Sequence, residues 1–476
     1  MKTAALRNLG CKVNEYETEA MEQLLIEDGY TIVPFDSPAD VYLVNTCSVT
    51  NIADRKSRQM LHRARRMNPD AVVIACGCYV QTAAEMEAAP RHLDPELAEE
   101  LALSDLADIL IGNNKKSLLI PTLHAYLRQH RPQMQLADIN FSGEDTSFDP
   151  LVRKTSGEKT RAFIKIQDGC DRYCSYCVIP YARGRVRSRR PEDVLNEIAG
   201  LASRGYREVI LSGIHIGSYG KDFENSKDLE DSADNGKIDG SGNSFLLDLI
   251  ERTAGIDGID RIRIGSIEPM TITEEFADRL SRIDEICPQF HLSLQSGCDA
   301  TLKRMNRKYT TKEFERCCEI LRRAFDHPAL TTDVITGFPG ETEEEFEETV
   351  NFLRRIDFYE LHVFPYSRRR GTPADQMPGQ LSEKVKKERA KRLIELGRQG
   401  AEHYRRSMIG RPAEVLFEER ILCADGIMRW TGYTREYIRC LYDGEGDYSD
   451  TVLSGKLAAP KDPDSETLLF LPDCVK

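Results

Sequence analysis

Three cysteines lie within eight residues in the stretch 168–184, at the spacing C-x3-C-x2-C: Cys170, Cys174 and Cys177. A structural zinc site needs four ligands, usually two pairs of Cys or His. No fourth cysteine or histidine lies nearby, and His215 is the next histidine along the chain. A four-iron cluster is held by cysteine thiolates, and with three of them it keeps one iron open for an added molecule. The spacing therefore favours a [4Fe-4S] cluster with a free coordination position.

A second set of cysteines is spread through the first part of the chain. Cys11, Cys47 and Cys78 each follow a short apolar run, and they are separated by 36 and 31 residues. A strand–helix–strand unit takes about 30 residues, so the three fall at equivalent places in successive units. The carboxyl ends of parallel strands share one edge of a sheet, which would bring the thiols together. The alternative is that they are isolated buried cysteines, which behave as small hydrophobic residues.

The elements that must position these cysteines give an α/β fold class. Strands expected at residues 3–10, 40–47 and 71–78 alternate with helical patterns, which predicts an N-terminal α/β domain with a parallel sheet. From about residue 161, strand–helix units predict a partial (β/α)6 barrel with functional residues at the carboxyl ends of its strands. Its strands are expected at residues 162–169, 208–213, 261–266, 290–297, 331–337 and 360–366.

Four segments follow from this pattern. Residues 1–135 form the N-terminal domain, 155–380 the partial barrel and 381–407 a charged connecting helix. Short strands separated by Gly, Asp and Pro predict a small antiparallel β-barrel over residues 408–476. Residues 221–244 are poor in apolar residues and rich in Asp, Ser, Gly and Asn, so we expect an acidic, flexible surface insertion.

The composition is that of a globular protein, with 40% hydrophobic and 30% charged residues. No apolar run is long enough for a signal peptide or for the ~18 residues of a membrane span. We therefore expect no membrane association and a cytoplasmic location, where thiols stay reduced. The 14 cysteines are then free thiols or ligands and not disulfides.

The net charge of −13 is unevenly distributed. Basic residues cluster at 55–66, 183–190 and 368–370. Each cluster is either a solvated face or a phosphate-binding surface, because salt limits the reach of distant acidic charge to about 10 Å. If 55–66 contacts RNA, removing charge at Arg63, Arg65 and Arg66 should weaken binding. The last segment, from Met408, has 8 basic and 13 acidic residues, which is unusual for an RNA-binding module.

The C-x3-C-x2-C segment after the first barrel strand resembles the radical S-adenosylmethionine superfamily. There the open iron chelates S-adenosylmethionine, and electron transfer releases a 5′-deoxyadenosyl radical. Further segments are similar to the methylthiotransferase family, and the end of the chain is similar to its TRAM domain. The likeness covers nearly the whole chain apart from the acidic insertion. These segments are LGCKVNEYETE, VNTCSVTNIADRKSRQ, GCYVQ, GCDRYCSYCVIPYARGRVRSR, LSGIHIGSYG, SLQSGCDATLKRMNRKYT and TDVITGFPGETEEEF.

The methylthiotransferase resemblance implies ligands and other site residues. Cys11, Cys47 and Cys78 would hold an auxiliary [4Fe-4S] cluster that delivers sulfur. The family pattern GC assigns the third ligand to Cys78 and leaves Cys76 as a buried neighbour. The resemblance leaves the catalytic residues unassigned. Residues expected to contact S-adenosylmethionine or the substrate are Tyr176 (near the adenine), Ser212 and Gly213 (methionine amino group), Glu268, Ser293, Gln295 and Asp333.

The implied reaction inserts sulfur into an unactivated C–H bond and transfers a methyl group. A radical can open such a bond, whereas acid–base catalysis cannot, and the two clusters must share one cavity for sulfur to reach the substrate radical. The N-terminal motifs look most like the branch that modifies C2 of N6-threonylcarbamoyladenosine at position 37 of tRNA. The expected partners are the anticodon stem-loop and a low-potential electron donor such as flavodoxin or ferredoxin.

Other interpretations remain open. Within the family, the substrate could be isopentenyladenosine in tRNA or an aspartate of a ribosomal protein. In a different class, the chain would be a non-enzymatic RNA-binding protein whose cysteines hold structural zinc. Iron content separates the two classes, since only the enzyme carries iron–sulfur clusters.

Overall fold

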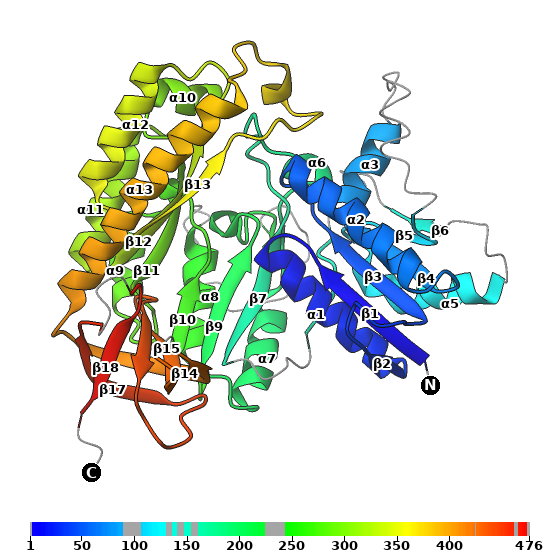
Figure 1. The fold of residues 1–476 in the computed structure, drawn as a ribbon, viewed down its shortest axis with the longest axis horizontal. Helices are drawn as coiled ribbons and strands as arrows, with labels where there is room; N and C mark the ends of the chain where they lie inside the picture. The colour runs from blue at the N-terminus through cyan, green and yellow to red at the C-terminus, as the bar shows by residue number, and fades with distance from the viewer. Residues whose placement is uncertain are drawn as a thin grey trace.

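Two α/β bodies lie side by side, and a small β-barrel lies beneath the larger one (Figure 1). The computed structural model describes residues 2–88, 106–129, 136–139, 147–153, 160–223, 243–423, 425–460 and 465–473. Residues 224–242 of the predicted insertion lie outside these ranges. Within the described part of the chain, no helix is both long and apolar enough to cross a membrane. The predicted α/β class, with its parallel N-terminal sheet, partial barrel and C-terminal β-barrel, is confirmed.

The N-terminal body is a parallel sheet covered by helices on both faces. Strand order is β2-β1-β3-β4-β5-β6, and a hydrophobic core fills each side. Three-residue strands carry too little pattern to be read from sequence, which is why β2, β5 and β6 escaped prediction. The strands are β1 (Lys2–Asn8), β2 (Tyr30–Ile32), β3 (Val41–Thr46), β4 (Val72–Gly77), β5 (Ile109–Ile111) and β6 (Leu136–Asp138). The helices include α1 (Lys12–Glu27), α2 (Asn51–Met67), α3 (Cys78–Ala88) and α5 (Leu119–Gln129).

The larger body is an open barrel made of two sheet segments, ordered β10-β9-β7-β8 and β11-β12-β13. Isolated parallel bridges join the segments, Ile262 with Ile286 and Ile267 with Leu292. The short β8 (Arg187–Ser188) pairs antiparallel with β7 and was not predicted. The parallel strands are β7 (Arg161–Asp168), β9 (Glu208–Gly213), β10 (Arg261–Ile264), β11 (Gln289–Gln295), β12 (Ala329–Thr336) and β13 (Glu360–Pro365).

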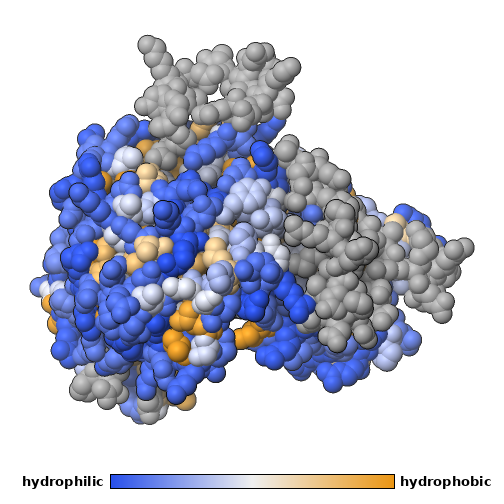
Figure 2. Space-filling view, turned by 90° about the horizontal axis from the view of Figure 1, so that it is seen from above, coloured by the Kyte–Doolittle hydropathy of each residue, from blue (hydrophilic) through white to orange (hydrophobic). Residues whose placement is uncertain are grey.

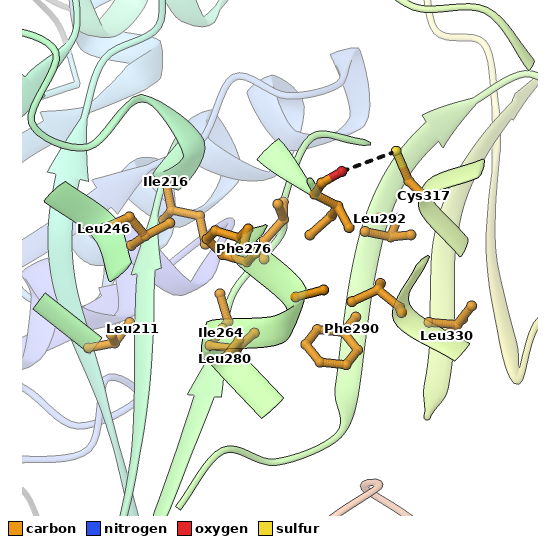
Figure 3. Close-up of a cluster of buried hydrophobic side chains, with 14 of the residues drawn as sticks. Leu211, Ile216, Leu246, Ile264, Phe276, Leu280, Phe290, Leu292, Cys317 and Leu330 are labelled. Atoms are coloured by element: carbon orange, nitrogen blue, oxygen red, sulfur yellow. Dashed lines mark hydrogen bonds between the residues drawn. The ribbon is translucent and has the colours of Figure 1, made fainter. Parts of the chain in front are cut away.

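Helices enclose the outer face of this open barrel. One strand face packs against them in a continuous apolar core, which includes Leu211, Phe290 and Leu292 of the strands and Phe276 and Leu280 of α9 (Glu274–Ser281) (Figure 3). These helices also include α7 (Pro191–Ala202), α8 (Asn243–Ala254), α10 (Asp299–Arg304), α11 (Thr311–Ala324), α12 (Glu343–Ile356) and α13 (Glu383–Met408). The short α6 (Ile179–Arg183) lies instead against α3 of the N-terminal body (Figure 1).

The acidic run near residue 345 is explained by the start of α12. Thr342 and Glu345 form a capping box, in which the Glu345 backbone N–H donates to Thr342 Oγ1 at 3.2 Å. Acidic side chains in a first helical turn also interact favourably with the helix dipole. This run therefore begins a helix and is not a charged surface loop.

The C-terminal segment is a closed barrel with strand order β14-β15-β16-β18-β17. It lies at the amino ends of the larger barrel's strands, and α13 leads down to it (Figure 1). Buried arginines of β10 hold it there: Arg261 donates to the backbone oxygens of Tyr433 and Glu414, both at 2.9 Å. The strands are β14 (Pro412–Leu422), β15 (Met428–Thr434), β16 (Arg439–Tyr442), β17 (Val452–Ala458) and β18 (Leu468–Pro472).

Candidate functional site

The N-terminal cysteines lie at one edge of the parallel sheet. β1, β3 and β4 are neighbours in register, and Thr46 pairs with Gly77 at their carboxyl ends. Cys11 precedes α1, Cys47 follows β3, and Cys78 is the first residue of α3. Burial raises the pKa of Cys47 to about 11, and the nearby thiols of Cys78 and Cys11 add to this. The fold thus brings together three thiols that are far apart in the sequence.

Close backbone approaches at the cysteine-bearing loops require glycine. Gly77, just before Cys78, has φ +96, and a β-carbon there would collide with the backbone oxygen of Thr46. Gly169, just before Cys170, has φ +70, and its β-carbon would collide with the oxygen of Arg185. Only glycine tolerates both the positive φ and the contact. The recurring Gly-Cys pair is therefore a backbone requirement at these loops.

The second cysteine triad forms a tight loop after β7. The backbone N–H of Cys170 donates to Gly184 O at 3.0 Å, and that of Cys177 donates to Cys174 O at 3.0 Å. Burial raises the pKa of Cys177 to about 12, and the neighbouring Cys174 and Cys170 raise it as well. Arg307 Nη1 donates to Cys174 Sγ at 3.3 Å. A buried guanidinium thus contacts the triad directly.

The type of donor in each triad suits an iron–sulfur cluster. Each triad supplies three cysteine thiols, and cysteine thiolates are the ligands of four-iron clusters. Both triads also lie beside a buried guanidinium, Arg183 or Arg307. The donors present therefore fit two cysteine-held clusters.

Arg183 belongs to a buried ionic network between the triads. Its Nη1 donates to Glu17 Oε1 at 2.9 Å and to Asp168 Oδ1 at 3.0 Å, and Lys165 Nζ lies 2.6 Å from both carboxylates. Lys116 also pairs with Glu17. Both carboxylates are surrounded by cations, which lower the pKa of Glu17 well below its usual value despite burial. The network joins the N-terminal body to the larger barrel.

This network corrects one interpretation of the basic cluster at 183–190. Arg183, Arg187 and Arg189 are 2%, 2% and 4% exposed and pair with acidic side chains. They are neither a solvated face nor a surface for phosphates. Glu17, one partner of Arg183, lies 166 residues away in the sequence, so no local pattern indicated that pair.

A group of charged side chains surrounds Glu268 beside the second triad. Arg172 Nη2 lies 2.6 Å and His215 Nε2 2.9 Å from Glu268 Oε2, and Arg307 Nη1 lies 3.4 Å from Oε1. Burial raises the pKa of Glu268, but His215, Arg307 and Arg172 outweigh it and lower the pKa to about 2. Sequence reasoning missed Arg172 and Arg307; the position of Arg172 inside the cysteine loop was the available signal.

Arg307 connects several residues of the site. Besides Cys174 and Glu268, it contacts Ser293, whose backbone oxygen accepts from Nη2 at 2.8 Å. Ser293 and Glu268, which the sequence assigned separately, thus meet through one guanidinium. Tyr176 lies in the same loop and packs edge to face on Phe338, with ring centroids 6.4 Å apart.

Other predicted residues line the inner face of the barrel. Ser212, Ser293 and Asp333 alternate with core residues along β9, β11 and β12, so they point away from the helices. Asp333 Oδ2 lies 3.2 Å from His291 Nε2 and is thus not part of the Glu268 group. His291 also stacks on His362, with centroids 5.5 Å apart. The barrel interior is therefore polar.

Gly213 and Gln295 end their strands in restricted backbone positions. A β-carbon on Gly213 would lie 2.9 Å from Gln167 O. Gln295 is buried and has φ +76. Cys76 lies in the sheet core, its Sγ 3.6 Å from Asn45 Oδ1. This is the place expected of a buried neighbour.

The carboxyl ends of the parallel strands point toward one face of the molecule (Figure 1). Seen from above, this face is mostly hydrophilic, with apolar residues on both sides of a hollow between the two α/β bodies (Figure 2). Arg369 bridges the bodies here: its Nη1 lies 2.6 Å from Asp54 Oδ2, near Cys47. This ion pair therefore joins the loop after β13 to the start of α2 in the N-terminal body.

Comparisons with known proteins identify the family. Residues 164–353 match the radical SAM superfamily, and residues 3–94 match the uncharacterized protein family UPF0004. The chain is 40% identical over 457 residues to the threonylcarbamoyladenosine tRNA methylthiotransferase of Bacillus subtilis, covering 96% of this chain and 94% of the relative. The chain belongs to the radical SAM tRNA methylthiotransferase family. The family resemblance seen in the sequence is thereby confirmed.

Other relatives of this methylthiotransferase are named for one of two modified adenosines. The threonylcarbamoyladenosine enzyme of Aquifex aeolicus is 36% identical, over 88% of this chain and 94% of the relative. The tRNA-2-methylthio-N6-dimethylallyladenosine synthase of Moorella thermoacetica is 34% identical, over 88% and 87%. The zinc-protein alternative is not favoured.

Solved structures agree on the fold of the methylthiotransferase. The radical S-adenosylmethionine methyltransferase TsrM of Kitasatospora setae superposes with a TM-score of 0.54 at 17% identity, over 79% of this chain and 77% of that one. At this identity the likeness concerns fold alone. Radical SAM membership implies S-adenosylmethionine and a [4Fe-4S] cluster.

Proposed function

We propose that this enzyme adds a methylthio group at C2 of N6-threonylcarbamoyladenosine, at position 37 of tRNA. The observation that carries the proposal is the 40% identity to the Bacillus subtilis threonylcarbamoyladenosine enzyme along nearly the whole chain. Relatives named for dimethylallyladenosine are 34% identical or less over shorter alignments. The relatives compared are named for tRNA, which disfavours a ribosomal-protein substrate.

In this proposal each cysteine triad holds a [4Fe-4S] cluster. Cys170, Cys174 and Cys177 would hold the one that, when bound, supplies the electron for cleaving S-adenosylmethionine, and Cys11, Cys47 and Cys78 the auxiliary one. The chain's own groups orient the reactants: Arg307 links Cys174, Glu268 and Ser293 in one rigid unit. Tyr176, Ser212, Gly213, Gln295 and Asp333 remain candidates for cofactor or substrate contact.

The polar barrel interior supports the threonylcarbamoyl branch. That substituent brings a carboxylate and a hydroxyl, which His291, Ser293 and Arg172 could bind, whereas an isopentenyl group needs an apolar pocket. Arg172 is 29% exposed in its side chain and so reaches the open part of the site. A site built on buried polar partners discriminates strongly, because the wrong substrate leaves those partners unpaired.

The test uses reconstituted enzyme with reductant, S-adenosylmethionine and tRNA carrying either modification. Mass spectrometry of nucleosides should detect 2-methylthio product from the threonylcarbamoyl tRNA and none from the isopentenyl tRNA. The reverse result would overturn the substrate assignment while preserving the reaction class. Modification of a ribosomal protein and of neither tRNA would remove the RNA substrate. Flavodoxin or ferredoxin should replace the chemical reductant, since the reaction needs a low-potential donor.

A further inference from the structure

Two exposed aromatic side chains lie beside the cysteine triads and have no part in the site described above. Tyr173, in the loop between Cys170 and Cys174, is 45% exposed, and Tyr181 on α6 is 37% exposed. Their rings meet edge to face, with centroids 5.9 Å apart. Aromatic rings carry large apolar area that is mostly buried in proteins. A paired exposure at the mouth of a site therefore points to contact with another molecule.

The position of Tyr173 is fixed by its backbone. Its φ of +49 lies in the left-handed region, which is uncommon for a residue with a β-carbon. Asn306 Nδ2 donates to Tyr173 O at 2.8 Å and holds this conformation. The cysteine loop thus presents the ring outward through local backbone geometry.

Tyr181 lies at the boundary between the triads. Its helix α6 packs on α3, whose first residue is Cys78. Asn113 Nδ2 donates to Ala182 O at 2.6 Å and lies 3.8 Å from Cys78 Sγ, so one side chain connects α6 to the N-terminal triad. Tyr173 comes from the other triad's loop. The aromatic pair therefore spans both halves of the site.

We propose that Tyr173 and Tyr181 form a stacking platform for an unpaired base of the tRNA anticodon loop, next to the nucleotide that is modified. This inference rests on the proposed function. Proteins that act on a base must remove it from its stack, and they hold single-stranded loop bases on aromatic faces. In an edge-to-face pair, one ring keeps a face open for a base to stack on, and the other ring borders that face. Arg185, exposed just beyond α6, adds positive charge for the phosphates.

The experiment uses an anticodon stem-loop RNA with N6-threonylcarbamoyladenosine and 2-aminopurine at the adjacent loop position. Y173A and Y181A should each weaken binding by about 5- to 100-fold, the cost of one lost base stack. The quenching of 2-aminopurine fluorescence that accompanies binding should be lost in the same variants. Y173F and Y181F keep the ring and should stay within about twofold of the native affinity. I394A, at an exposed apolar residue of α13, is the matched control.

Each other outcome has a definite meaning. Unchanged affinity and quenching in both alanine variants would overturn the platform. Slower reduction by flavodoxin with unchanged RNA affinity would also overturn it and make the pair a donor-docking surface. If native enzyme modifies only the isopentenyl RNA but the tyrosine variants still lose binding and quenching, the platform holds and the substrate assignment fails. Iron content and unfolding midpoint, measured on every variant, identify any that misfold.

Discussion

At the residue scale, burial decides what each charged or thiol group does. Arg183 is fully buried and donates to Glu17, Asp168 and Asn14. It also lies near Cys11, whose pKa is raised by burial and lowered by this guanidinium. A buried charge must be paired because an isolated one costs several kcal/mol. The arginine thus docks the two bodies, and it reduces the rise in the pKa of Cys11 without reversing it.

Separate triads predict separate iron contents. Replacing Cys170, Cys174 and Cys177 together with alanine should leave about half of the iron and sulfide, because three thiolates suffice for each cluster. The matched variant at Cys11, Cys47 and Cys78 should retain the other half. Iron and sulfide are measured after anaerobic reconstitution. Full retention, or complete loss from a folded variant, would contradict two independent sites.

At the element scale, ion pairs separate the basic residues of α2 into those engaged with acidic side chains and those that are exposed. Arg63 pairs with Asp36 at 2.6 Å, and Arg65 pairs with Asp108 at 2.9 Å. These two arginines, which the sequence offered as phosphate contacts, are engaged within the protein. Arg55, Lys56 and Arg66 are instead exposed. Helical periodicity brings Arg55 and Arg66 onto one outward face, which is the face available to RNA.

We expect only this outward face to affect RNA binding. Changing Arg55, Lys56 and Arg66 to glutamine should flatten the slope of log Kd against log salt by about 0.7–0.9 per lost phosphate contact. The matched variant R63Q/R65Q should leave the slope unchanged and lower stability slightly. Filter binding of tRNA over a salt series measures both. Equal slopes for the native protein and for the variant at Arg55, Lys56 and Arg66 would show that this face does not contact RNA.

The buried carboxylate of Glu208, which pairs with an arginine beside the C-terminal barrel, predicts that the free energy of unfolding depends on pH. Glu208 is fully buried, and Arg263 Nε donates to its Oε1 at 2.8 Å. Burial raises the pKa of Glu208, but Arg263 and Arg161 outweigh it, so the folded pKa lies below the ordinary 4.5. A lowered pKa contributes stability above the unfolded value, and this is lost as pH falls.

E208Q should therefore lower the free energy of unfolding at pH 7 by about 3–5 kcal/mol, the cost of leaving buried cations unpaired. The difference from the native protein should shrink as pH falls below about 4.5. Urea unfolding at several pH values measures this. D260N, at an exposed pair with Arg207, should change little. A difference that stays constant down to pH 3 would contradict the assignment.

At the scale of the whole molecule, the arrangement of the bodies sets the chemistry. The N-terminal body and the larger barrel meet at the buried Glu17–Arg183 network and again at Arg369, which is 5% exposed and pairs with Asp54. The C-terminal barrel lies at the opposite ends of the strands (Figure 1). Any contact it makes with RNA is therefore remote from the cysteine triads.

Loosening the Arg369 bridge should reduce product without emptying the sites. R369A should speed hydrogen exchange in residues 48–54 and 366–377 and lower methylthiolation by about tenfold or more, because small misplacements of reacting groups are costly. Iron content should be unchanged. R323A, at an exposed pair with Glu274, is the control. Normal exchange with normal turnover in R369A would make the bridge dispensable.

The sequence alone determined the spacing of the cysteines and the approximate strand ends. The C-x3-C-x2-C loop, the equivalent positions of Cys11, Cys47 and Cys78, and the partial barrel all follow from local patterns whose periods are set by backbone geometry. The family motifs extended this to the reaction class. Short strands such as β8 and the tertiary partners of single residues lay outside such patterns.

Only the tertiary structure decided which charges are buried and which are free. Arg183 and Arg185 are two residues apart in one basic run, yet one is fully buried against Glu17 and the other is exposed. Arg307 is distant in sequence from Cys174 and donates to its sulfur. Ion pairs of this kind depend on the three-dimensional approach of segments far apart in the chain, and Coulomb energy depends on that distance and on burial. Sequence spacing fixes neither quantity.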